Sequence, residues 1–251
     1  MELELETAKL NFETQGNKNN PPLVLWHGAG CTLRMWDFVV KELKKEFYTI
    51  AFDVRGAGKS INLETDQEYY SFEQYSQDLN DILDFLSVEK VHVWSMAWGT
   101  RAAIAYSSMF PNKVISAVFS DASIGIADID AQKFGLKDAL KKQEKTGIEK
   151  FKMPEAWNIH LNQESASLSL QAAGKFDLTK AIKKISFPYL VMTGDHDPNL
   201  PSSKDIVKNS ISGELKILEC VGHGSVLQRP DLTLESFLEW HKLIKSRDAK
   251  R

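Results

Sequence analysis

The order of apolar and polar positions along the chain predicts two kinds of β-strand. Between residues 2 and 14 apolar and polar side chains alternate, and the register slips near Thr7. This stretch therefore predicts one bulged strand or two short antiparallel strands with one buried face. Farther on there are short, nearly continuous apolar runs, which are typical of strands covered on both faces in a parallel sheet. These runs span residues 23–26, 48–52, 91–94, 114–119, 189–193 and 215–218.

Helical patterns lie between most of these strands. Apolar residues recur with helical spacing in segments 36–47 and 72–86, as on the buried face of an amphipathic helix. Strands that alternate with helices form right-handed βαβ units. The sequence therefore predicts an α/β fold with a mostly parallel, doubly wound sheet, and a final helix with a solvated tail over residues 231–251.

One interval breaks the alternation of strands and helices. Residues 125–185 are helical in pattern and rich in lysine, and they contain no convincing strand. We interpret them as a small helical lid inserted into an α/β core that comprises residues 1–124 and 186–251.

Composition favours a small molecule as the partner of this chain. Of its 251 residues 43% are apolar and 26% charged, as in a soluble globular protein. The formal net charge of -3 and the pI near 6.1 provide no basic field, so neither a nucleic acid nor a membrane is expected as a partner. The cysteines, Cys31 and Cys220, are too few for a disulfide framework, and the acidic N-terminus lacks the pattern of a signal peptide. We expect a cytoplasmic protein.

The segment 91–103 predicts a strand that turns sharply into a helix of small residues. In the nucleophile elbow, G-x-S-x-G, the central residue lies on a strained turn and its flanking positions are small. Ser95, Ala97 and Gly99 occupy these three positions. A register shifted by two residues, with Ser95 as the nucleophile, and an ordinary turn without a function are the alternatives.

An acid and a base follow later in the chain, each directly after a predicted strand. Segment 193–198 contains Asp197, and segment 221–224 contains His223. The order nucleophile, acid, histidine is that of the α/β hydrolases. Loops at the carboxyl ends of neighbouring parallel strands converge on one crevice, where these groups would meet. Asp121, at the end of an earlier strand, is the alternative acid.

Further motifs extend this pattern over nearly the whole chain, which resembles the α/β-hydrolase superfamily. The lid and the segment after the strand at 114–119 most resemble 3-oxoadipate enol-lactonases and related small ester hydrolases. The motifs that carry the resemblance are Trp26-His27-Gly28-Ala29-Gly30, Met35-Trp36, the turn D-x-R-G-x-G-x-S at 53–60, Phe119 to Gly125, Gly147-Ile148-Glu149, Trp157 and Asp197-Pro198.

The resemblance implies a role for each matching residue. It makes Asp197 the acid of a catalytic triad, His223 the base and Ala97 the occupant of the nucleophile position. It also implies that no cofactor is needed. The other implied site residues are Ala29 and Trp98, whose backbone amides would form the oxyanion hole, and Gly28, Trp36 and Trp157 in the substrate pocket.

The departure from the family pattern lies at the nucleophile, because Ala97 has no oxygen to deprotonate. We interpret the sequence as a serine-to-alanine form of a carboxylic-ester or lactone hydrolase, nearly inactive as given, and more consistent with an engineered replacement than with natural decay of the site. A non-catalytic receptor for a small ligand on a hydrolase scaffold is the alternative from another class. A C–C bond hydrolase is a further alternative.

Two other patterns predict no site of their own. Residues 56–60 resemble the end of a phosphate-binding loop, but Asp53 stands where that motif requires glycine. Residues 195–197 offer carboxylate and imidazole groups, yet three adjacent residues rarely converge on one metal ion. We therefore expect no metal site, and we expect Cys31 to be a small packing residue.

Overall fold

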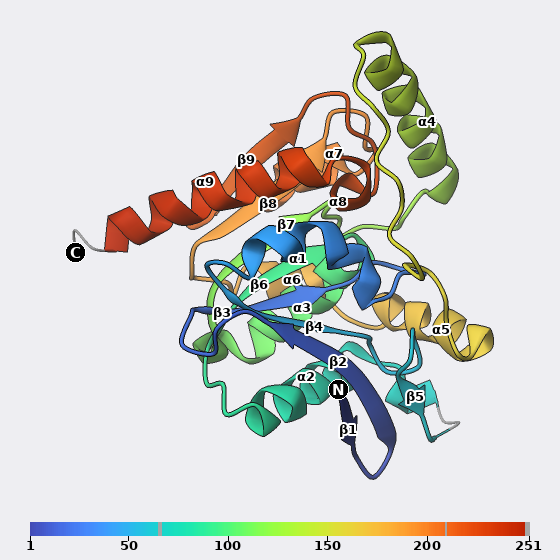
Figure 1. Ribbon diagram of the computed structural model, residues 1–251, viewed down its shortest axis with the longest axis vertical. Coiled ribbons are helices and arrows are strands. Elements are labelled where there is room, and N and C mark those ends of the chain that lie inside the picture. Colours follow the sequence, from blue (N-terminus) through green and yellow to red (C-terminus); the bar gives the residue numbers. More distant parts are fainter. Residues whose placement is uncertain (65–66, 209, 249–251) are drawn as a thin grey trace.

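The computed structural model shows one large twisted sheet with helices on both faces (Figure 1). It describes residues 1–64, 67–208 and 210–248. In the described residues the strand order is β1-β2-β4-β3-β6-β7-β8-β9, and β5 pairs with β2 beside this row. The pairs from β4 to β9 are parallel, and those of β1, β2 and β5 are antiparallel. The predicted mostly parallel α/β fold is confirmed.

The bounds of the strands agree closely with the apolar runs of the sequence. The N-terminal stretch forms two strands, as the slip near Thr7 indicated. The strands are β1 Glu2–Glu4, β2 Ala8–Gln15, β3 Pro22–Trp26, β4 Tyr48–Phe52, β5 Ile61–Asn62, β6 Val91–Met96, β7 Val114–Ser120, β8 Tyr189–Gly194 and β9 Gly213–Leu218.

Only the last strand differs from its prediction in burial. β9 lies at the edge of the sheet, and its side chains are half-buried or exposed except for Leu218. Its sequence alternates Leu215, Lys216 and Ile217, which is the mixed pattern of an edge strand. The expectation of a strand covered on both faces is therefore wrong for β9.

The helices divide between the two faces of the sheet according to their apolar stripes. The first face is covered by α2, α3, α6 and α7, and the second by α1, α8 and α9. Successive residues of one strand serve opposite faces: Val24 packs in the first layer and Leu25 in the second. These helices are α1 Asp37–Leu43, α2 Phe72–Phe85, α3 Trp98–Met109, α6 Leu178–Ile182, α7 Leu200–Lys208, α8 Ser225–Gln228 and α9 Pro230–Asp248. The last three residues of the predicted C-terminal segment, 249–251, lie outside the described residues.

The segment predicted as a lid contains helices and no strand. Helix α4 (Ile129–Lys145) projects from the sheet at the upper right of Figure 1 and is followed by an irregular segment and by α5 (Gln163–Ser169). The last part of the segment differs, because α6 packs Leu178 and Ala181 into the main core. The division into core and lid stays a prediction. In the described residues no helix is long and apolar enough to cross a membrane.

Candidate active site

The turn after β6 has the geometry of a nucleophile elbow. Ala97 lies between the last residue of β6 and the first residue of α3, and its φ is 54°, a conformation that L-residues rarely adopt. Gly99 lies against the backbone oxygens of Trp26 and His27, where any Cβ would collide. The sharp turn and this close backbone contact explain the small residues on both sides of position 97.

Ser95 lies in a different environment from Ala97. It is fully buried within β6, and its hydroxyl lies 3.1 Å from Thr100 Oγ1 and donates to Val118 O at 3.3 Å. Ser95 does not line the cavity described below, whereas Ala97 does. The structure therefore disagrees with the shifted register in which Ser95 is the nucleophile.

An acid and an imidazole meet beside this turn. Asp197 follows β8 and His223 lies between β9 and α8, and Asp197 Oδ2 is 3.1 Å from His223 Nδ1. A carboxylate bound to Nδ1–H leaves Nε2 free to take a proton. Burial lowers the pKa of His223, but the hydrogen bond with Asp197 and the charges of Asp121 and Asp197 outweigh burial and hold the pKa above its ordinary value.

Asp121 brings a second carboxyl group to the same place. It directly follows β7, is completely buried, and its Oδ2 accepts the amides of Gly224 at 3.0 Å and Ser225 at 2.7 Å. Ligand atoms of Asp121, Asp197 and His223 lie within 4.8 Å of one another. Burial, and after it the charge of Asp197, raises the pKa of Asp121 to about 7. The imidazole itself donates its Nδ1–H to Asp197, the acid that the resemblance implies.

The loop after β3 is braced by the ring of His27. His27 Nε2 accepts the amide of Val54 at 3.0 Å, so Nδ1 carries the proton and donates to Gly28 O at 2.9 Å. Burial lowers the pKa of His27, which agrees with this neutral ring. In the described part of the chain the amides of Ala29 and Trp98 donate to no protein acceptor. Their role in an oxyanion hole stays a prediction.

The elbow and the imidazole open into one apolar cavity of about 280 Å³. Ala97, Ala29 and His223 line it together, and Trp157 from the predicted lid lies on its wall, as the sequence predicts. Leu136, Leu140 and Phe151, apolar residues of the predicted lid, also lie on the wall, as expected of a lid that closes over the pocket. The residues that complete the wall become neighbours only through the fold. They are Cys31, Met96, Lys150, Met153, Gly224, Leu227 and Gln228.

Two residues expected in the substrate pocket lie outside its lining. Trp36 is fully buried, and its ring packs against Trp94 with the centroids 5.3 Å apart. A Cβ at Gly28 would come within 2.8 Å of Met96 Cε, so this glycine allows the loop after β3 to approach β6. The structure thus corrects the expectation for Trp36 and Gly28, because close packing of the core accounts for both residues.

The glycine-rich turn at 56–60 encloses a carboxylate of the protein itself. Asp53 accepts the amides of Leu33 at 2.7 Å and Lys59 at 2.9 Å. The Asp53 carboxyl group also fills the space that a Cβ on Gly58 would need. This turn therefore holds the acidic side chain of Asp53 at the place where a phosphate-binding loop would hold its ligand.

The side chains of residues 195–197 point to two different places. His196 Nδ1 lies 2.5 Å from Asp195 Oδ1, and its Nε2 lies 2.6 Å from Lys142 Nζ. Asp197 points instead to His223. These three adjacent residues do not converge on one point.

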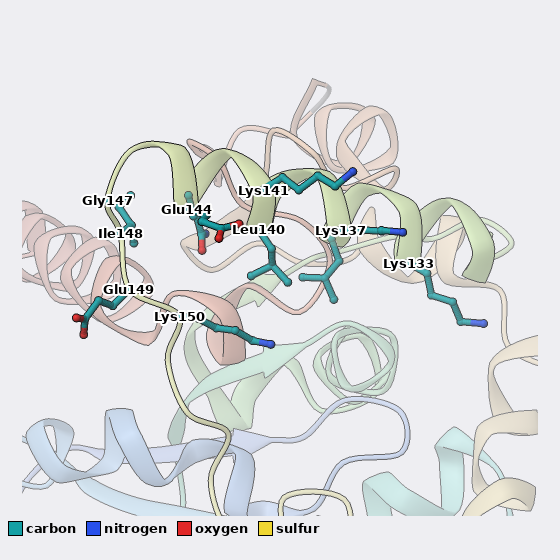
Figure 2. Close-up of a pocket in the computed structure, with 11 residues that line it drawn as sticks. Lys133, Lys137, Leu140, Lys141, Glu144, Gly147, Ile148, Glu149 and Lys150 are labelled. Atoms are coloured by element: carbon teal, nitrogen blue, oxygen red, sulfur yellow. The ribbon is translucent and has the colours of Figure 1, made fainter.

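A second, more open hollow of about 820 Å³ runs along α4 (Figure 2). Figure 2 shows Leu140 pointing from α4 toward the body of the protein, while Lys137 and Lys141 point along the outer side. Leu136, Leu140 and Lys150 line both this hollow and the 280 Å³ cavity. The hollow along α4, which four lysines line, therefore adjoins the candidate site.

Comparison with known proteins identifies the class of this fold and site. The profile of the family described as alpha/beta hydrolase fold matches residues 21–146, half of the chain. The chain belongs to the α/β-hydrolase fold family. This family match covers β3 to α4 and includes the elbow at Ala97.

Individual relatives are distant but extend over the whole chain. The chain is 22% identical to 3-oxoadipate enol-lactonase 2 of Acinetobacter baylyi over 249 residues, which cover 91% of each chain. Its fold is similar to the enol-lactonase of Burkholderia xenovorans, with a TM-score of 0.79, 18% identity and coverage of 96% of this chain and 100% of that one. A thermophilic esterase from Thermogutta terrifontis gives a TM-score of 0.77 at 19% identity, with 97% and 99% covered.

Proposed function

We propose that this chain is a carboxylic-ester or lactone hydrolase whose nucleophile position holds alanine. The observation that carries the proposal is that Ala97, on a strained elbow, and His223, bound to Asp197, line one cavity. The names of the lactonase and esterase relatives support the substrate class.

A serine at position 97 would supply the missing step. His223 Nε2 takes the proton of the serine hydroxyl as its oxygen attacks the substrate carbonyl carbon, and the amides of Ala29 and Trp98 stabilise the oxyanion. The C–O bond breaks, the leaving oxygen takes the proton from His223, and an acyl-enzyme remains. A water molecule, deprotonated by His223, then attacks the acyl carbon. The bond to the serine oxygen breaks, this oxygen takes the proton back from His223, and the acid is released.

The cavity restricts the substrate to a small, largely apolar molecule. A volume of about 280 Å³ lies near the lower limit for ligand sites, and its wall is mostly aliphatic, aromatic and methionine side chains. A short acyl chain or a small lactone ring fits this wall, and His223 supplies a polar group beside the reacting carbonyl. The proposed chemistry requires no cofactor.

The test is to compare the chain with its Ala97→Ser variant on short-chain aryl esters, enol-lactones and diketones. Loss of the serine from such a triad costs on the order of a million-fold in turnover, about 8 kcal/mol of barrier. We therefore expect the chain as given to bind substrate with almost no turnover and the variant to gain a rate of that order. Mass spectrometry of the variant should reveal an acyl adduct on the introduced serine.

A matched control separates the two serine positions of the elbow. Ser95→Ala, combined with Ala97→Ser, should leave hydrolysis within a few-fold of the single variant, because Ser95 is buried in β6 and does not line the cavity. Equal activity with alanine or serine at position 97 would mean that position 97 is not the nucleophile position.

A receptor for a small ligand is the second candidate, and the observation that favours it is alanine at position 97 in a well-formed cavity. Tight binding of an ester or lactone without turnover by either form would support the receptor. Cleavage of diketones alone by the serine form would indicate a C–C bond hydrolase instead.

A further inference from the structure

The carboxyl group of Asp121 holds the chain on both sides of a sharp bend directly after His223. Its Oδ2 accepts the amides of Gly224 and Ser225, and Gly224 has a φ of 91°, which favours glycine. We call residues 221–225 the His223 loop. Because the two amides follow His223 in the chain, the position of the Asp121 carboxyl group helps to fix the position of the imidazole.

The segments that carry the two acids are also joined to each other. Asn199 donates from Nδ2 to Asp121 O at 3.1 Å, and its amide donates to Asp197 Oδ1 at 2.9 Å. Asp121, Asp197 and the His223 loop therefore form one hydrogen-bonded unit, in which a shift of one group displaces the others.

The hydrogen bonds to the amides of Gly224 and Ser225 use only one oxygen of Asp121 and do not explain why the second oxygen is buried. Oδ1 is buried and has no hydrogen-bond partner among the described residues, although a neutral side chain would accept the same two amides. Burying an unpartnered carboxylate oxygen beside a second carboxyl group raises the free energy of the folded protein. His223, which lies within 4.8 Å, offsets part of this cost because its protonated ring carries a positive charge, and hydrogen bonds of Ser225 offset another part.

We propose that Asp121 is a positioning residue of this site, which holds the His223 loop and, together with Asp197, stabilises the protonated imidazole. Asp197 fixes the ring through Nδ1, and Asp121 acts through the loop and through its charge. In hydrolysis the imidazole becomes a cation when it takes the proton of the nucleophile. A second nearby carboxylate lowers the energy of that cation.

The charged neighbours of His223 determine in which direction its pKa should change when Asp121 is replaced. Burial lowers the pKa of His223, the hydrogen bond with Asp197 and the charge of Asp121 raise it, and the charge of Arg101 in α3 lowers it. Lys150, from the segment after α4, lines the same cavity as His223. Removing the charge of Asp121 should therefore lower the midpoint of the His223 titration by about one pH unit.

The experiment is an NMR titration of the His223 ring in the chain as it exists, with Ala97 in place. Asp121→Asn removes the charge and keeps an oxygen that accepts the two amides, whereas Asp121→Ala removes both. We expect a lower midpoint with Asn, and with Ala a lower midpoint together with altered amide shifts at Gly224 and Ser225. Asp195→Asn is the matched control. Asp195 also binds the His223 loop, accepting the amide of Val221 at 3.2 Å, but it lies outside the cluster of three groups. The Asp195 variant should leave the midpoint unchanged.

Hydrolysis supplies a second readout, and only this part rests on the proposed function. In the Ala97→Ser background, kcat/KM should rise with pH as the imidazole loses its proton. Asp121→Asn should move the midpoint of this rise down by about one pH unit, the same shift as in the NMR titration. If Ala97→Ser shows no hydrolysis while the titration still shifts, the proposed function fails and the role of Asp121 stands.

An unchanged His223 midpoint in folded Asp121→Asn overturns the inference. If that variant does not fold, the carboxyl carbon of Asp121, assigned through its backbone amide, is titrated in the unsubstituted chain. If the Asp121 carbon shows no step at the midpoint of the His223 titration, the inference is overturned equally. A step of the Asp121 carbon that coincides with the His223 titration supports it.

Discussion

Buried charges connect the N-terminal strands to the rest of the molecule. Arg55 is fully buried, its Nε and Nη2 contact both carboxylate oxygens of Asp78 at 2.9 and 2.6 Å, and its Nη1 donates to Thr7 O at 2.8 Å. The guanidinium therefore joins the turn after β4 to α2 and to the segment between β1 and β2. The turn motif that carried the family resemblance at 53–60 is here an organising element of the fold.

Asp78→Asn should destabilise the protein by about 3 to 5 kcal/mol, because it leaves a buried guanidinium without its counter-charge. Urea unfolding followed by tryptophan fluorescence measures this change. Asp84→Asn is the control: Asp84 pairs with Lys113 at 3.4 Å on the surface, and its loss should cost less than about 1 kcal/mol. Similar losses for both variants would contradict the organising role of Arg55.

The strained backbone of Ala97 leads to a second prediction about a single residue, which concerns the free energy of unfolding. A φ of 54° costs a non-glycine residue roughly 1 to 3 kcal/mol, whereas glycine adopts it freely. Ala97→Gly should therefore raise the free energy of unfolding or leave it unchanged, despite the greater freedom of glycine in the unfolded chain. Ala103→Gly, at a buried position inside α3, should lower it by about 1 kcal/mol or more. Equal destabilisation by both would show that the elbow is not strained.

The sequence predicted those site residues that stand directly after strands, because the ends of parallel strands meet at one edge of the sheet. The elbow turn at Ala97 and the pairing of Asp197 with His223 could be anticipated in this way. About half of the lining of the cavity could not be anticipated. Trp36 has the side chain of a pocket residue but packs on Trp94, and only the fold brings Met96 and Leu227 to the cavity.

Among the elements, the predicted lid contains two parts that are attached to the core in different ways. The irregular part lies on the loops of the site: Thr32 donates its amide to Trp157 O at 2.7 Å, and His160 Nδ1 accepts the amide of Gly58 at 2.8 Å. Helix α4 is attached through the close packing of Gly135 and through Gln143 Nε2, which donates to Cys220 O at 2.8 Å. Its other contacts, those of Lys142 and Asp138 with His196, lie at the surface and contribute little to stability. Between these two parts, α4 is the one expected to open.

Hydrogen exchange tests this difference between the two parts of the lid. Amides of α4 should exchange at a lower free energy of opening than the amide of Leu161, which donates to Gly58 O at 2.8 Å. Gln143→Ala should speed exchange in α4 about fivefold, since one hydrogen bond contributes roughly 1 kcal/mol. Glu144→Ala, at the exposed neighbouring position, should not. Slower exchange in α4 than at Leu161 would contradict the division.

At the scale of the whole molecule, the sequence predicted the central strands of the sheet, because a strand that is buried on both faces is uniformly apolar. That pattern identified β3, β4, β6, β7 and β8, whereas β9 was predicted as a covered strand and is an edge. Short elements such as β5 and α8 could not be predicted, because they contain too few residues to show a period. The sequence also did not predict that Asp121 lies beside both Asp197 and His223, because the three residues lie on separate loops that only the fold brings together.

The burial of Asp121 beside Asp197 makes the stability of the whole molecule depend on pH. Burial and the charge of Asp197 raise the pKa of Asp121 to about 7, whereas in the unfolded chain it is near 4. Between these two values the folded protein binds the proton of Asp121 and the unfolded chain does not. The contribution of this group to stability is therefore largest below about pH 4 and is lost as pH rises toward 7.

Asp121→Asn removes this dependence, so the stability of the variant relative to the unsubstituted chain should increase between pH 4 and pH 8. The upper bound of the increase is roughly 4 kcal/mol, the equivalent of about three pKa units. Measuring the difference between the two proteins cancels the contributions of titrating groups whose pKa the substitution leaves unchanged. His223 does not cancel, and its lower midpoint in the variant acts in the same direction as the loss of the Asp121 titration. Urea unfolding at several pH values gives this difference, and Asp195→Asn, which changes a carboxyl group exposed to solvent, should show no comparable increase. A difference for Asp121→Asn that is independent of pH would mean that Asp121 keeps an ordinary pKa in the folded protein, and that its burial is compensated by groups other than a bound proton.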